Sequence, residues 1–224
     1  MTVITISREF GSGGMDIGRQ VAETLNYHFV DKGIIGRVLG QYGLAQFSQE
    51  YDSPTSFWDR FDAHRMKERA LVGNMLNQAL VSFARHGDMV IVGRCGFAVL
   101  GGLADVLNVR LQAPLADRIA RVMEREKIAD FAQAEAVVKE GDKLRSAFIE
   151  LSYGVPWDSA RAFDLVIDTA KLPPSVAVTF ILEAVKALPA DAMGNARTTR
   201  TLVADPILAS AVSYELKCEA VHQA

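Results

Sequence analysis

The chain has 224 residues, of which 50% are hydrophobic and 23% charged, with 24 Lys and Arg against 27 Asp and Glu. Its net charge of −3 argues against a nucleic-acid coat or a polybasic membrane binder, although a local anion site stays open. The apolar content excludes disorder, and 17 glycines and 7 prolines exclude a coiled coil. Two distant cysteines, Cys95 and Cys218, and apolar runs too short to span a bilayer predict a reduced, cytoplasmic, globular protein.

The residue pattern predicts alternating strands and helices along most of the chain. In chain order, the expected elements are strand Val3–Ser7, helix Ile17–Leu25, strand Tyr27–Val30, helix Ile34–Gln41, helix Asp59–Arg85, strand Met89–Val92, strand Val106–Leu111, helix Leu115–Lys127, helix Ala132–Glu150, strand Phe163–Ile167 and helix Ser175–Leu188. Residues 43–58 are polar and interrupted by proline, so a loop with one helical turn at most is expected there. Five apolar strands separated by helices indicate an α/β fold with a parallel sheet covered on both faces.

The composition changes at Pro189, after the last of these helices. Residues 189–204 are expected to form a linker, and residues 205–224 a helical extension. Asp205 is the expected N-cap of that helix, with Pro206 at its first position. The extension is too short to be an independent domain, so we expect either a homodimer contact or the start of a further module.

The most informative stretch is the glycine-rich turn that follows the first strand. Strand, glycines and helix in this order form a cradle for an anion, because glycine permits the backbone angles that turn N–H groups inward. The dinucleotide-binding pattern fails, since Asp16 stands where its third glycine should be. The P-loop pattern is nearly met from Gly13, with Arg19 for lysine, and better from Arg8, with Gly14 for lysine. The alternative is a tight turn without a ligand.

Residues 7–14, which read SREFGSGG, resemble the opening motif of the cytidylate kinase-like family, a divergent branch of the P-loop nucleoside monophosphate kinases. The resemblance covers roughly residues 1–188. It implies a P-loop three-layer sandwich with a lid region at about 114–160, ATP as a substrate, Mg²⁺, and CMP or dCMP as the acceptor. The residues it implies for the ATP phosphates are Gly11, Ser12, Gly13, Gly14, Met15, Asp16 and Arg19. Asp16 is either a Mg²⁺ ligand or a carboxylate that stabilises the helix start.

Two further segments resemble the acceptor-binding parts of cytidylate kinases. Residues 31–37 resemble the family pattern D-[ST]-G-x-x-Y-R, which implies acceptor contacts by Asp31 and Arg37. A solvated helix charge is an equally good reading of Arg37. Gly93-Arg94-Cys95-Gly96 is similar to the G-R-D-I-G segment, with Cys95 in place of the aspartate. An arginine at the carboxyl end of a buried strand is costly unless it meets an anion, so Arg94 is expected to bind a phosphate.

A cationic face is expected on the helix after the fourth strand. Arg118, Arg121 and Arg125 fall within roughly a 60° arc beside an apolar stripe. This pattern is expected of a lid helix over ATP, but surface arginines paired with acidic neighbours would give the same pattern. Asp142 and Arg145 resemble the D-x-x-R of the kinase lid, and Arg145 is expected to reach the transferred phosphoryl group when the lid closes. The expected catalytic residues are Arg8, Arg118, Arg121 and Arg145. The arginines expected to converge on one cleft are Arg8, Arg19, Arg37, Arg94, Arg118, Arg121 and Arg145.

The sequence therefore predicts transfer of the γ-phosphoryl group of ATP to a nucleoside monophosphate. Phosphoryl transfer requires positive charge, a metal ion and two substrates held in line, which these arginines would supply. Two alternatives stay open at this point. One is a nucleotide-binding regulator that has lost turnover, since the glycine turn lacks the P-loop lysine. The other is a kinase that acts on a non-nucleotide acceptor. Small-molecule nucleotides are the expected partners.

Overall fold

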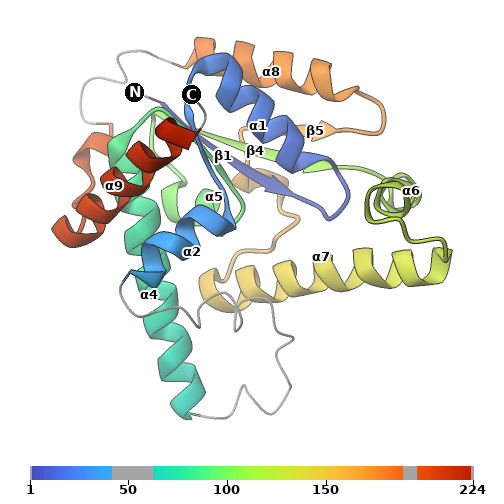
Figure 1. Cartoon of the computed structure of the whole chain (residues 1–224), viewed down its shortest axis with the longest axis horizontal. Coiled ribbons are helices and arrows are strands. Elements are labelled where there is room, and N and C mark those ends of the chain that lie inside the picture. Colours follow the sequence, from blue (N-terminus) through green and yellow to red (C-terminus); the bar gives the residue numbers. More distant parts are fainter. Residues whose placement is uncertain (1, 42–62, 189–195, 223–224) are drawn as a thin grey trace.

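A five-stranded parallel sheet forms the centre of the computed structural model, which describes residues 2–41, 63–188 and 196–222 (Figure 1). Its strands are β1 (Val3–Arg8), β2 (His28–Val30), β3 (Met89–Val92), β4 (Val106–Gln112) and β5 (Leu165–Asp168). They lie in the order β2-β3-β1-β4-β5, and each neighbouring pair is parallel. The predicted α/β sandwich is thus confirmed.

Helices cover both faces of the sheet (Figure 1). Helices α1 (Gly14–Leu25) and α8 (Pro174–Ala187) pack on one face, and α2 (Lys32–Gly40), α4 (Ala63–His86), α5 (Gly96–Leu100) and α9 (Pro206–His222) pack on the other. Helix α6 (Leu115–Glu126) packs on α7 (Phe131–Tyr153). Short 3₁₀ turns occupy Ala160–Ala162 and Thr199–Thr201. In the described ranges, the helices all fall short of the length and apolar character needed to cross a membrane.

The alternation of residues in β1 decides which face of the sheet carries polar groups. Ile4 and Ile6 are fully buried against α1 and α8, so Thr5 and Ser7 point to the opposite face. Thr5 Oγ1 donates to Asn108 Oδ1 of β4 at 2.7 Å, and Ser7 Oγ accepts a hydrogen bond from Trp157 Nε1 at 3.1 Å. Hydroxyl groups therefore line this face near the carboxyl ends of the central strands.

Several element boundaries differ from the sequence predictions. Strand β5 begins at Leu165 instead of Phe163, because the Phe163 N–H closes the preceding 3₁₀ turn by donating to the Ala160 carbonyl. Helix α5 was not predicted: it has only five residues and follows three consecutive residues with positive φ. The expected loop at 43–58, and the first residues of the helix expected from Asp59, lie outside the described residues.

The C-terminal helix α9 shares the core of the sheet. As predicted, the Asp205 carboxylate caps the helix, accepting the N–H groups of Ile207 and Leu208 at 2.9 Å. Leu208, Val212 and Leu216 are buried in one cluster with residues of α2 and α4.

The segment before α9 is also tied to the sheet domain. Thr199 donates its N–H and hydroxyl to Asp105, and Arg85 Nη1 donates to the carbonyls of Arg200 and Leu202. The boundary between a kinase-like domain and an extension stays a prediction. A homodimer contact through the extension also stays a prediction, and Tyr214 is among the exposed residues of α9 that such a contact would have to use.

Candidate active site

The glycine turn connects β1 to α1 and leaves the helix N-terminus without a side-chain cap. Gly11 and Gly13 have φ values of 83° and 78°, which a residue with a side chain rarely adopts. Gly13 is the N-cap of α1, so the first N–H groups of that helix lack a capping side chain. Ser12 is fully buried, and its hydroxyl donates to the Glu9 carbonyl at 2.9 Å. Ser12 thus shapes the turn, while the bare helix start can receive an anion.

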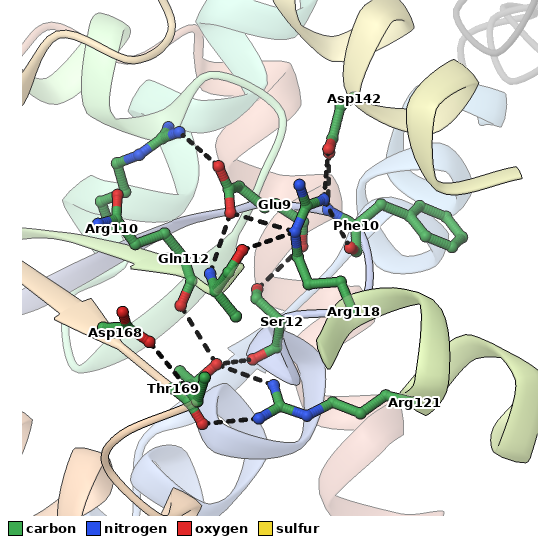
Figure 2. Close-up of polar contacts among 12 residues, drawn as sticks. Glu9, Phe10, Ser12, Arg110, Gln112, Arg118, Arg121, Asp142, Asp168 and Thr169 are labelled. Carbon is green, nitrogen blue, oxygen red and sulfur yellow. Dashed lines mark hydrogen bonds and ion pairs between the residues drawn. The ribbon is translucent and has the colours of Figure 1, made fainter. Parts of the chain in front are cut away.

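A network of charged groups fastens this turn to α6 and α7 (Figure 2). Arg118 is buried; its Nε donates to the Ala113 carbonyl at 2.8 Å, and its Nη1 donates to the Phe10 carbonyl at 3.1 Å and to the Asp142 carboxylate. Asp142 also accepts the Phe10 N–H at 2.8 Å, and Glu9 lies 3.4 Å from Arg118. Arg118, predicted as catalytic, is therefore placed where it holds the loop in shape.

Arg121 makes a second connection on the other side of the turn (Figure 2). Its guanidinium donates to the Thr169 hydroxyl at 3.0 Å and to the Thr169 carbonyl at 2.7 Å. The Thr169 hydroxyl in turn donates to the Ser12 carbonyl at 2.9 Å. Asp168 caps the turn after β5 by accepting the Ala170 N–H at 2.9 Å. Arg121 thus links α6, the end of β5 and the glycine turn.

A cavity of about 690 Å³ opens beside the glycine turn, at the carboxyl ends of β1 and β3. Open α/β sheets bind ligands at this end of their strands. Aromatic side chains of α5 and α7 and Trp157 line its apolar part, and Thr5 and Ser7 line its floor. The charged residues that line it are Arg8, Asp31, Lys32, Arg94, Arg125, Glu126 and Arg145. Five cations against two carboxylates make this a site for a polyanion.

Of the seven arginines expected in one cleft, the structure brings Arg8, Arg94 and Arg145 to this cavity. Arg19 is exposed on α1, with its guanidinium 4.6 Å from the Phe29 ring centroid. Arg37 points toward α9, where its Nε pairs with the buried carboxylate of Glu215. Together with Arg118 and Arg121, these residues lie outside the cavity lining. Their proposed contacts with substrate stay predictions.

Backbone strain marks the turn that carries Arg94. Gly93, Arg94 and Cys95 have φ values of 81°, 50° and 61° in succession. Left-handed backbone at a residue with a side chain costs of order 1–3 kcal/mol, and such strain concentrates at functional sites. Cys95 is buried and is the N-cap of α5. This strained turn places Arg94 in the lining of the cavity, and its contact with a phosphate stays a prediction.

Arg8 carries the most perturbed charge in the cavity. Burial, and then repulsion from Arg145 and Arg94, lowers the pKa of Arg8 to about 9. Asp31 opposes this shift, but its Oδ1 already accepts the N–H groups of Gly33 and Ile34 as the N-cap of α2. A phosphate near Arg8 would offset the repulsion among the arginines.

Residues that the sequence analysis missed include Arg110 and Glu9. Arg110, buried in β4, donates to the Trp157 carbonyl at 2.7 Å and lies 3.5 Å from Glu9, and its guanidinium stacks 4.8 Å from the Trp157 ring. Burial lowers the pKa of Arg110, and the Glu9 carboxylate opposes that shift. The sequence did contain a signal for this site. Asn108 and Arg110 are polar residues two positions apart in an otherwise apolar strand, which places both side chains on the same face of the sheet.

Mg²⁺ was expected at Asp16, which is exposed in the first turn of α1. Within the described ranges, His, Cys, Asp and Glu form no group of three or more that could hold a metal ion. Mg²⁺ is commonly bound by one or two carboxylates together with substrate phosphates and water. This sparse donor set fits a metal ion that enters with the nucleotide, and a contact with Asp16 stays a prediction.

The strand order and the glycine turn after β1 define a fold of the P-loop kinase type. Among solved structures, an uncharacterized protein from Eubacterium ventriosum has a TM-score of 0.63 at 22% identity, covering 84% of this chain and 99% of that one. Shikimate kinase from Bacteroides thetaiotaomicron has a TM-score of 0.50 at 12% identity, covering 83% and 98%. At these identities the likeness concerns the fold.

Residues 3–171 match the family model of the cytidylate kinase-like family, so the chain belongs to this family. This confirms the resemblance seen in the sequence. A cytidylate kinase of Ignicoccus hospitalis is 29% identical over 186 residues, covering 81% of this chain and 97% of that protein. A cytidylate kinase of Pyrobaculum neutrophilum is 31% identical, covering 82% and 92%.

We expect phosphate-bearing anions to stabilise the protein through this cavity. A ligand at about 100 times its Kd stabilises the folded state by about 2.7 kcal/mol, which for this chain length raises Tm by roughly 5–10 °C. Differential scanning fluorimetry with pyrophosphate, against sodium chloride of equal ionic strength, measures the shift. Equal shifts with pyrophosphate and chloride would contradict a specific site for anions.

Proposed function

We propose that the protein transfers the γ-phosphoryl group of MgATP to a nucleoside monophosphate, with CMP or dCMP as the preferred acceptor. The observation that carries the proposal is the convergence of Arg8, Arg94 and Arg145 on one cavity beside an uncapped helix N-terminus. Two polyanionic substrates can approach each other only if such charges offset their repulsion. The relatives named cytidylate kinase support the choice of cytidine nucleotides.

The arrangement supports a division of roles among the charged residues. Residues 11–16 would hold the ATP phosphates at the start of α1, and Arg94 with Asp31, which both line the cavity, would hold the acceptor. Arg145, on α7, would stabilise the charge of the transferred group. The acceptor phosphate is itself the nucleophile, so this reaction needs no general base.

A coupled assay of diphosphate formation with MgATP tests the proposal directly. We expect kcat/KM for CMP or dCMP to exceed that for AMP by at least about tenfold, the factor that a difference of 1.4 kcal/mol in transition-state binding produces. UMP serves as the matched pyrimidine comparison. If the protein turns over only with a non-nucleotide acceptor, nucleoside monophosphates are not its acceptor class and the proposal is wrong on this point.

A second candidate is a nucleotide-binding regulator without turnover. In the register that begins at Arg8, Gly14 stands at the P-loop lysine position and Met15 at the position of the hydroxyl residue. These two substitutions favour a loss of catalysis. Tight nucleotide binding by calorimetry, combined with no diphosphate product from any nucleoside monophosphate, would support the regulator and contradict the kinase.

A further inference from the structure

The side chain of Arg8 crosses the position from which a P-loop lysine would start. Gly14 is the first residue of α1, and its φ is not in the positive range that requires glycine. A Cβ placed on Gly14 would nevertheless lie 2.7 Å from both Cβ and Cγ of Arg8, closer than real Cβ atoms come. Any side chain at position 14 would therefore displace the stem of Arg8.

The far end of the same side chain rests on a second glycine. A Cβ on Gly93 would lie 1.9 Å from Arg8 Nη1 and 2.9 Å from its Cζ. The guanidinium thus sits against the backbone at the end of β3, next to Arg94. Arg8 therefore runs from the glycine turn, where the donor phosphates are expected, to the turn that carries Arg94.

The partners of Arg8 leave its charge available to a ligand. Within the described part of the chain, its hydrogen-bond contact is the sulfur of Met15, 4.0 Å from Nη2, and no carboxylate pairs with it. The arginines outside the cavity differ, since Arg118 pairs with Glu9 and Asp142. The lowered pKa of Arg8 agrees with a buried cation that lacks an anion.

We propose that Arg8 performs the role of the missing P-loop lysine by contacting the β- and γ-phosphates of ATP, and that the glycine at position 14 is required to let it do so. Relative to the P-loop pattern, two differences belong together. The cation, Arg8, stands at the end of the strand instead of the start of the helix, and the first helical residue, Gly14, has no side chain. This inference rests on the proposed function only in taking the triphosphate to be ATP.

A double-mutant cycle on nucleotide affinity tests this coupling. The variants are Arg8→Gly, Gly14→Ala and the pair together, with Kd for MgAMP-PNP measured by titration calorimetry. Glycine is used at position 8 because alanine would keep the Cβ that a Cβ at position 14 meets at 2.7 Å. Arg8→Gly should weaken binding about 30-fold, equivalent to about 2 kcal/mol for lost charged hydrogen bonds. Gly14→Ala should cause a loss of at least tenfold with Arg8 present and less than about threefold in the Arg8→Gly background. The pair Arg8→Gly with Gly14→Lys should regain part of the affinity, because it rebuilds the ordinary lysine position.

Gly73→Ala is the matched control, since a Cβ at this helical glycine would meet no atom within 4 Å. It should leave Kd unchanged. If Arg8→Gly does not fold, Arg8→Gln keeps the stem and removes the charge, and melting curves verify that each variant is native. Additive effects of the two substitutions, an unchanged Kd without the Arg8 charge, or no binding of MgAMP-PNP to the native protein would each overturn the inference. Coupled substitutions without any diphosphate product would instead overturn the proposed kinase activity and leave the role of Arg8 standing.

Discussion

Replacing Arg94 with alanine is expected to raise the KM for the acceptor about 100-fold, while KM for ATP changes by less than about threefold. Arg94 lines the cavity just after the end of β3. Hydrogen bonds to a charged group contribute about 1.5–3 kcal/mol, and each 1.4 kcal/mol corresponds to a factor of ten. Initial-rate kinetics with each substrate varied in turn separate the two constants.

Two comparisons make this result specific to the Arg94 side chain. Alanine and lysine both keep the strained backbone at φ 50°, so neither changes the strain that the native residue already carries. Arg94→Lys should lose less affinity, because the charge remains but the planar fork is lost. Arg161→Ala removes an exposed arginine outside the cavity and should leave both constants unchanged. Equal increases in the two KM values would show that Arg94 supports the fold instead of binding the acceptor.

The fold could be predicted because its strands are apolar and its turns are marked. Strand β3 is buried throughout, and its sequence MVIV is an uninterrupted apolar run, as expected of a parallel strand covered on both faces. Helix α5 escaped prediction because one turn has no detectable periodicity. The glycine turn could be predicted from the spacing of its glycines, because its backbone conformation requires glycine at those positions.

The site was harder to predict, because a sequence shows which charges exist and not which of them pair. Arg8 and Arg118 look alike in the sequence, yet one lines the cavity and the other lies between Glu9 and Asp142. Arg37 matches a family pattern, but its side chain pairs with Glu215, which lies 178 residues later in the chain. Such long-range pairs depend on how α9 and α7 pack, which local pattern does not determine.

Replacing Asp142 with alanine is expected to lower the free energy of unfolding by about 3 kcal/mol, since it removes a hydrogen bond between charged groups and leaves a loop N–H without its acceptor. Asp142 accepts from Arg118 and from the Phe10 N–H (Figure 2), and without it Arg118 keeps Glu9, at 3.4 Å, as its carboxylate partner. For a chain of this length, Tm should fall by roughly 6–12 °C. Thermal melts followed by circular dichroism measure the shift.

The control for this loss is Glu140→Ala, two residues earlier on the same helix. Glu140 is exposed and pairs with the exposed Lys143 at 3.6 Å, so its removal should cost less than about 1 kcal/mol. Asp142→Asn should fall between the two, because its amide oxygen can still accept from Phe10. Adding Arg118→Met to Asp142→Ala should recover part of the stability, since the buried guanidinium that has lost one of its two carboxylates is then removed. If Asp142→Ala melts no lower than Glu140→Ala, the glycine turn is held by its own backbone and not by the contact with α7.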